Sequence, residues 1–152
     1  MNSWLLRGLG LALVHVVIRV VLGFAIAQWP LHGSIARFAL FAVVVVVAGV
    51  WGYADAKADR RDFPSGRGGA DLTIGWLCAS ALGAVAAGIV CWVIGHFAKI
   101  DTGGEGLIFE LTSGAAWTLL LIFIPAMIGI GISHFLARRQ ENHDSERTPA
   151  SV

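Results

Sequence analysis

His15, Arg19 and Glu110 lie inside apolar stretches of this sequence, where ionisable residues are rare. His15 and Arg19 are four residues apart in the first stretch, and Glu110 is the only acidic residue inside any stretch. A charged side chain at the centre of a bilayer costs about 2.5–3.5 kcal/mol on insertion scales, so it faces protein or water rather than lipid. His15, Arg19 and Glu110 are therefore the candidates for a transport path or an intramembrane polar site.

On a helix, the two basic residues share a face with small residues. His15 and Arg19 fall within an arc of about 80° that also holds Gly8, Ala12 and Gly23, while Leu11 and Ile18 cover other faces. Small residues permit close helix approach, so we expect the arc to face the bundle. Two interpretations of Arg19 stay open: a structural arginine that snorkels to the outer interface and ties helices together, or a residue on a transport or ligand path.

Glu110 shows the same pattern with the opposite charge. An arc of about 100° around it holds the small residues and the proline of the last stretch: Gly114, Thr118, Pro125 and Gly129. We predict an ion pair between Glu110 and Arg19, because either charge is costly to leave unpaired in a low dielectric. Depth is the difficulty, since Glu110 lies near the outer end of its stretch and Arg19 near the middle of its own.

The composition assigns these residues to membrane helices. The chain has 152 residues, of which 57% are hydrophobic and 14% charged, whereas soluble domains are about 45–50% apolar and about 25% charged. Four apolar stretches, roughly residues 5–27, 35–53, 72–97 and 107–136, are each long enough to cross about 30 Å of hydrocarbon. The sequence predicts an all-α integral membrane protein, with one four-helix transmembrane domain over residues 1–137 and a disordered cytoplasmic tail over residues 138–152.

Lysine and arginine predict the orientation. Eight of them lie in the N-terminus, the middle loop and the tail, and the other two loops hold one each, Arg37 and Lys99. The positive-inside rule then places both termini in the cytoplasm of a multi-pass protein of the plasma (inner) membrane. A cleaved signal peptide is the alternative, since Ala25 and Ala27 form a small-x-small site, but His15 and Arg19 interrupt its apolar region.

The polar segment over residues 54–71 is predicted to be a solvated hairpin loop, and Trp76 just after it an interfacial aromatic anchor.

The third apolar stretch carries small residues on two sides of the expected helix. One stripe holds Gly75, Ala79, Gly83 and Ala86, and the other holds Ser80, Ala84, Gly88, Cys91 and Gly95. This helix is either central in the monomer or uses one stripe for a homodimer. Besides the lipid bilayer, we expect a homo-oligomer or a larger membrane partner.

Several function classes lack their residue patterns. No nucleophile with a base, phosphate loop or zinc spacing occurs, so we expect no enzyme, no catalytic residue, no metal and no cofactor. The net charge of +1 provides no electrostatic footprint for nucleic acid. His32, His96 and Glu110 all lie near outer ends of stretches and could meet as a metal or proton site, although their spacing does not require it.

Several segments also resemble a known family. They are Met1-Asn2-Ser3-Trp4-Leu5-Leu6-Arg7, His15-Val16-Val17-Ile18-Arg19 with Gly23, Trp29-Pro30-Leu31-His32-Gly33-Ser34, Trp51-Gly52-Tyr53-Ala54-Asp55 and Asp71-Leu72-Thr73-Ile74-Gly75-Trp76-Leu77. They look like small four-span membrane proteins of mycobacteria and related actinobacteria, grouped by fold analogy with bacterial four-span members of the drug/metabolite transporter superfamily. The resemblance extends to about Leu136 and implies a transporter.

The chain departs from that superfamily's small multidrug exporters at one point. Those exporters use a glutamate in the first helix to exchange protons for cationic drugs, whereas this first stretch carries His15 and Arg19. A basic pair repels a lipophilic cation, so an anionic or neutral solute fits better.

The sequence thus predicts a small-solute transporter. In it, Arg19 is the substrate-anion or gating residue, His15 a protonatable neighbour and Glu110 the counter-charge. The helices pack through their small residues, among them Gly8, Gly23, Gly83, Gly88 and Gly114. The competing hypothesis is a non-transporting accessory or structural subunit that packs against a larger membrane complex through the glycine stripes of the third stretch.

Overall fold

The computed structural model describes residues 3–63, 71–98 and 106–147, which are nearly all helical. The elements are α1 (Ser3–Gln28), η1 (Pro30–His32), α2 (Gly33–Asp62), α3 (Leu72–Ala98), α4 (Leu107–Phe109), η2 (Glu110–Gly114) and α5 (Ala115–Arg147). Within these residues, four helical stretches are long and apolar enough to cross a membrane: Ser3–Gln28, Pro30–Asp62, Leu72–Phe97 and Leu107–His143. The prediction of an all-helical chain with four membrane-length helices is confirmed.

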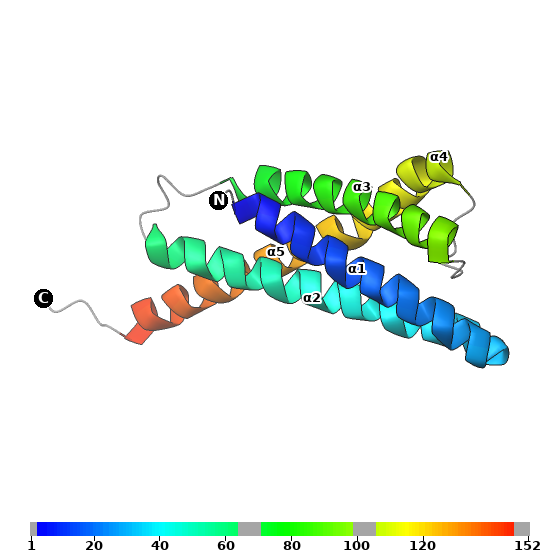
Figure 1. Ribbon diagram of the computed structural model, residues 1–152. Coiled ribbons are helices and arrows are strands. Elements are labelled where there is room, and N and C mark those ends of the chain that lie inside the picture. Colours follow the sequence, from blue (N-terminus) through cyan, green and yellow to red (C-terminus); the bar gives the residue numbers. More distant parts are fainter. Residues whose placement is uncertain (1–2, 64–70, 99–105, 148–152) are drawn as a thin grey trace, which may run out of the picture.

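The four long helices alternate in direction. Helices α1 and α3 run one way, and α2 and α5 run the other (Figure 1). Helix α1 packs mainly on α3, α2 packs mainly on α5, and α3 also contacts α5. We call the end of the bundle where α1 begins the N-terminal end. There α1 and α3 start side by side, and they diverge toward the opposite end (Figure 1).

Glycines determine how closely α1 approaches α3. A Cβ atom on Gly8 would lie 2.8 Å from the carbonyl oxygen of Ala79, and a Cβ atom on Gly83 would lie 3.0 Å from the carbonyl oxygen of Gly8. These neighbours are backbone atoms, which cannot move aside as a flexible side chain can. Gly8 and Gly83, which the sequence suggested as packing residues, both lie at this close contact.

The contact between α2 and α5 is closer still. A Cβ atom on Gly52 would meet the carbonyl group of Ala126, at 2.9 Å from its Cα atom, and one on Gly129 would overlap the carbonyl oxygen of Gly49. Any side chain at Gly52 or Gly129 would therefore push the two backbones apart. Gly129 was expected on the small face of the last stretch, whereas nothing in the sequence singled out Gly49 and Gly52.

The core joins all four helices through one cluster of buried residues, namely Leu11, Ile18, Val44, Ala48, Trp76, Ile122 and Ala126. Leu11 and Ile18 were expected on faces of α1 turned away from the bundle, and this expectation is wrong. The buried face of α1 contains them together with Gly8, Ala12 and His15. It is wider than the predicted arc because α1 is covered by side chains of α2 as well as by α3.

Two predicted boundaries are also wrong. Helix α2 continues to Asp62, so residues 54–62 of the predicted hairpin loop are helical. Helix α5 continues to Arg147, so the disorder predicted from residue 138 is wrong as far as Arg147, and residues 148–152 lie outside the described residues. In both places the helix extends beyond the apolar segment, because polar residues such as Arg and Gln are good helix formers once a helix has started.

Helix α3 is central in the monomer. Ala79 and Gly83 of one stripe face α1, and both are buried. Members of the other stripe are covered too, since Ser80 and Cys91 are fully buried and Gly88 faces the backbone of Glu110. The buried members of both stripes are thus covered within the monomer, as the alternative that places this helix at its centre predicts.

Candidate functional site

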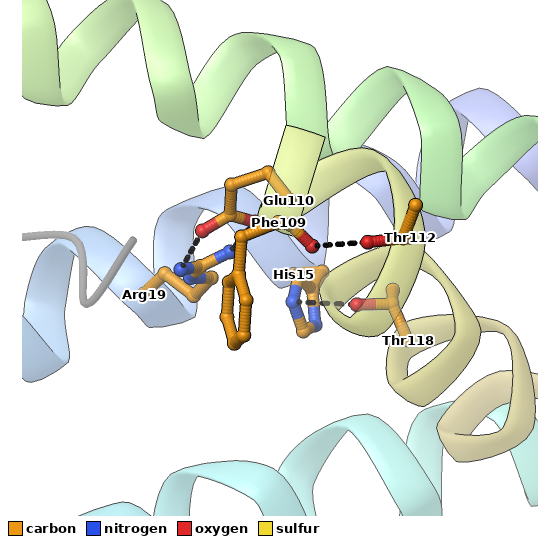
Figure 2. Close-up of polar contacts among 6 residues, drawn as sticks. All are labelled: His15, Arg19, Phe109, Glu110, Thr112 and Thr118. Carbon is orange, nitrogen blue, oxygen red and sulfur yellow. Dashed lines mark hydrogen bonds and ion pairs between the residues drawn. The ribbon is translucent and has the colours of Figure 1, made fainter. Parts of the chain in front are cut away.

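Arg19 of α1 and Glu110 of η2 form a bidentate ion pair (Figure 2). Nη1 of Arg19 donates to Oε2 of Glu110 and Nη2 donates to Oε1, each over 2.7 Å. The exposed fractions of the two side chains are 14% and 3%. Parallel hydrogen bonds between a guanidinium and a carboxylate are the strongest geometry for such a pair. The predicted pairing is confirmed.

Glu110 lies deeper in the bundle than its place near the start of the last apolar stretch suggested. A Cβ atom on Gly88 would lie 3.2 Å from the carbonyl oxygen of Glu110, so these two residues lie level with each other. Gly88 precedes the last residue of α3 by ten positions, which is about 15 Å along a helix. Glu110 thus lies well inside the bundle, at a depth that Arg19 can reach. Gly88, which the sequence suggested as a packing residue, is the position at which η2 approaches α3.

A local change of helix geometry shapes the site around Glu110. Residues Glu110–Gly114 form a π-helical turn, in which the N–H group of Ala115 donates to the carbonyl oxygen of Glu110. A Cβ atom on Gly114 would lie 2.8 Å from Oε2 of Glu110, so the missing side chain at Gly114 leaves room for the carboxylate to fold back over this turn. Single π-helical turns are rare and frequently mark functional sites.

His15 lies one turn before Arg19 and is 2% exposed. Its Nε2 atom and the hydroxyl oxygen of Thr118 are 3.3 Å apart, within hydrogen-bond distance (Figure 2). Its ring is parallel to the ring of Phe41, with 6.4 Å between the centroids. Its Nδ1 atom is buried and has no hydrogen-bond partner in the described part of the chain. Buried polar atoms without a partner cost about 1–3 kcal/mol, so this one requires an explanation.

All three candidate residues line one pocket of about 300 Å³. Its polar lining consists of His15, Arg19, Arg37, Glu110 and Thr118, and its aromatic lining consists of Phe41, Phe109 and Trp117. Gly23, which the sequence suggested as a packing residue, lines this pocket as well. Side chains from α1, α2, α4, η2 and α5 therefore converge on a single cavity.

Arg37 was expected only as a loop charge, and its place in the pocket lining was not predicted from the sequence. It lies in the first part of α2, four residues before Phe41 and therefore on the same face. That spacing, a basic residue one turn before an aromatic residue at the start of an apolar helix, was the available signal. Which cavity this face lines depends on the arrangement of the helices.

A second ion pair ties the N-terminal end of the bundle together. Nε of Arg7 lies 2.7 Å from Oδ2 of Asp55, and the indole N–H of Trp76 donates to the same oxygen over 3.1 Å. The Arg7 guanidinium also lies over the Trp76 ring, 5.8 Å from its centroid. Trp76 is fully buried, so its prediction as an interfacial anchor is wrong. The cluster links α1, α2 and α3 far from the pocket and has a structural role.

The remaining histidines have other neighbours. His96 stacks on Trp92, with 5.5 Å between ring centroids, and Glu110 is held by Arg19, so the alternative in which His32, His96 and Glu110 meet is not supported. Across residues 3–63, 71–98 and 106–147, no three potential metal ligands come together. His134 lies 3.3 Å from a guanidinium nitrogen of Arg60, at the N-terminal end of the bundle.

Comparison with protein-family models finds no match for this chain, and comparison with curated protein sequences finds none either. The geometry of the site and its setting must therefore carry the functional argument. That setting is a pocket with one complete ion pair and one further arginine, built on helices of membrane-spanning length.

Proposed function

We propose that this protein is a small-solute transporter of the plasma membrane, of the four-span drug/metabolite transporter type, and that the pocket is its solute site. The observation that carries the proposal is the place of the Arg19–Glu110 ion pair. The pair lies among membrane-length helices and forms part of the wall of a pocket. Charges inside membrane helices are costly, and those that face a cavity are typical of solute and ion pathways.

The ion pair is suited to act as a gate. It joins α1 to η2 toward the end of the bundle where α1 and α3 diverge (Figure 1). Arg19 retains 14% exposure of its side chain, so a charged group of a solute can approach it from the pocket. If a charged group of the solute replaced one partner of the ion pair, α1 would be released from η2. Access to the pocket would then change.

The orientation belongs to the same proposal. With both termini in the cytoplasm, the diverging end of the bundle faces outward. Arg37 lines the pocket near this end. The accessory-subunit hypothesis depended on a free glycine stripe on α3, and the monomer covers both stripes. A homo-oligomer would therefore assemble through the lipid-facing sides of the other helices.

Flux measurements in proteoliposomes test this proposal. Uptake is measured for a panel of radiolabelled small solutes that contains anions, cations and neutral compounds. We expect at least one to enter faster than into protein-free vesicles, and Arg19→Gln to abolish that excess. Arg61→Gln, which changes an exposed arginine at the far end of α2, is the matched control and should transport normally.

A second variant covers the case in which Arg19→Gln does not fold. Gly23→Leu keeps every charge and fills the pocket that Gly23 lines, so it should stop uptake while the helical content measured by circular dichroism is retained. The proposal is wrong if no solute enters faster with the wild-type protein, or if the folded variants at Arg19 and Gly23 both transport normally.

A further inference from the structure

We propose that the pocket binds a small organic monoanion with an apolar body, and that Arg37 recognises its negative charge. This inference rests on the proposed function, because it assigns a substrate class to the same pocket. It adds a residue to the site and a chemical class to the solute, and each has an observation of its own.

The charge of the pocket is the first observation. Arg19 and Glu110 neutralise each other through two hydrogen bonds of 2.7 Å. Arg37 lines the same pocket, is exposed, and forms no ion pair with Asp or Glu in the described ranges. The described lining therefore carries one uncompensated positive charge, which attracts an anion and repels a cation.

The apolar walls are the second observation. Phe41 lies one turn after Arg37 on α2, and Phe109 and Trp117 add two more aromatic rings to the lining. Leu22 and Ile26 of α1 complete the apolar part. A single cationic group beside aromatic and aliphatic walls matches a ligand with one anionic group and an apolar remainder.

The volume of the pocket and the unpartnered nitrogen of His15 describe the ligand further. A volume of about 300 Å³ lies at the lower limit of ligand pockets, which span about 300–1,000 Å³, so one ring with one carboxylate is a suitable size. His15 provides a polar group without a partner, its Nδ1 atom, at the wall of this pocket. The atom is covered in this conformation, so a ligand reaches it only after the ring turns.

Three probes of nearly identical shape and different charge test the proposal. At neutral pH, para-fluorobenzoate is an anion, para-fluorobenzamide is neutral and para-fluorobenzamidine is a cation. Binding is measured by fluorine NMR line broadening with the purified protein in detergent micelles, and protein-free micelles correct for partitioning into detergent. We expect the benzoate to bind about tenfold or more tightly than either analogue, as one charge-assisted hydrogen bond implies.

Matched arginine variants identify the residue responsible. Arg37→Gln should remove the preference for the benzoate, and Arg61→Gln, on the same helix at the far end, should keep it. Both side chains are exposed, so neither change disturbs the core. The proposal is overturned if the amide or the amidine binds as tightly as the benzoate, if no probe binds, or if the preference survives Arg37→Gln.

These outcomes are distinguishable from failure of the proposed function. The binding experiment asks only which charge the pocket accepts, whereas the flux panel includes cations and neutral solutes. Uptake of a cation that Gly23→Leu blocks would refute the anion assignment and leave the transporter in place. Anion binding without uptake of any solute would refute transport and leave the binding site in place.

Discussion

Removing either charge of the buried ion pair should destabilise the protein strongly, and neutralising both should cost less than the sum of the two single changes. Arg19→Gln leaves Glu110 alone at a position where its side chain is 3% exposed, and Glu110→Gln leaves Arg19 at 14% exposure. Removing one partner of a buried pair costs about 3–5 kcal/mol, because the remaining charge stays in a low dielectric. We expect each single variant to lose about 3 kcal/mol or more of unfolding free energy, and the double variant to lose at least about 2 kcal/mol less than the sum.

The assay is reversible unfolding in mixed micelles, with an SDS titration followed by circular dichroism for the wild type, both single variants and the double variant. The Arg7–Asp55 pair provides a comparison within the same chain, tested with Arg7→Gln and Asp55→Asn. It has a single contact of 2.7 Å, and its carboxylate is 15% exposed, so its coupling energy should be smaller. If the effects of the Arg19 and Glu110 variants add within about 0.5 kcal/mol, the two charges do not interact and the reasoning is refuted.

Three further predictions concern packing, polar contacts and orientation. Gly52→Ala should strongly reduce the yield of folded protein, because the added Cβ atom meets the backbone of α5, whereas Gly131→Ala has nothing within 4 Å and should behave as wild type in size-exclusion chromatography. Trp76→Phe removes one buried N–H donor to a carboxylate and should lower the unfolding free energy by about 1–3 kcal/mol in the SDS titration. An unchanged value would mean that the indole N–H does not stabilise the cluster of Arg7, Asp55 and Trp76. In a variant without the native cysteines, an impermeant maleimide applied to intact cells should label Ser34→Cys but not Gln140→Cys, both at exposed positions, and the reverse pattern would invert the proposed orientation.

Part of the site was predictable because it follows from helix periodicity. Arg19 and Glu110 are costly in lipid and each shares a face with small residues, so the sequence alone pointed to their pairing. Periodicity does not show how deep a helix lies. The return of the chain beside Gly88, which lowers Glu110 into the bundle, became visible only in the structure.

The contribution of α2 could not be predicted for a similar reason. Arg37 and Asp55 both looked like solvated loop charges, yet one lines the pocket and the other binds Arg7 and Trp76. Hydropathy ends a helix where apolar residues end, whereas hydrogen bonding continues the helix as long as good helix formers follow. Sequence spacing does not reveal which helices or cavities the residues at such ends will face.

That the chain forms four membrane-length helices, and that two opposite charges turn away from lipid, follows from the sequence alone. Both conclusions follow from local terms, namely the length of apolar segments and the cost of a charge in hydrocarbon. The folded bundle shows which helices pair, how closely Gly52 and Gly129 bring α2 to α5, and that a cavity remains beside the ion pair. These depend on contacts between residues far apart in the chain, so only the packed bundle shows that Arg37 joins the site.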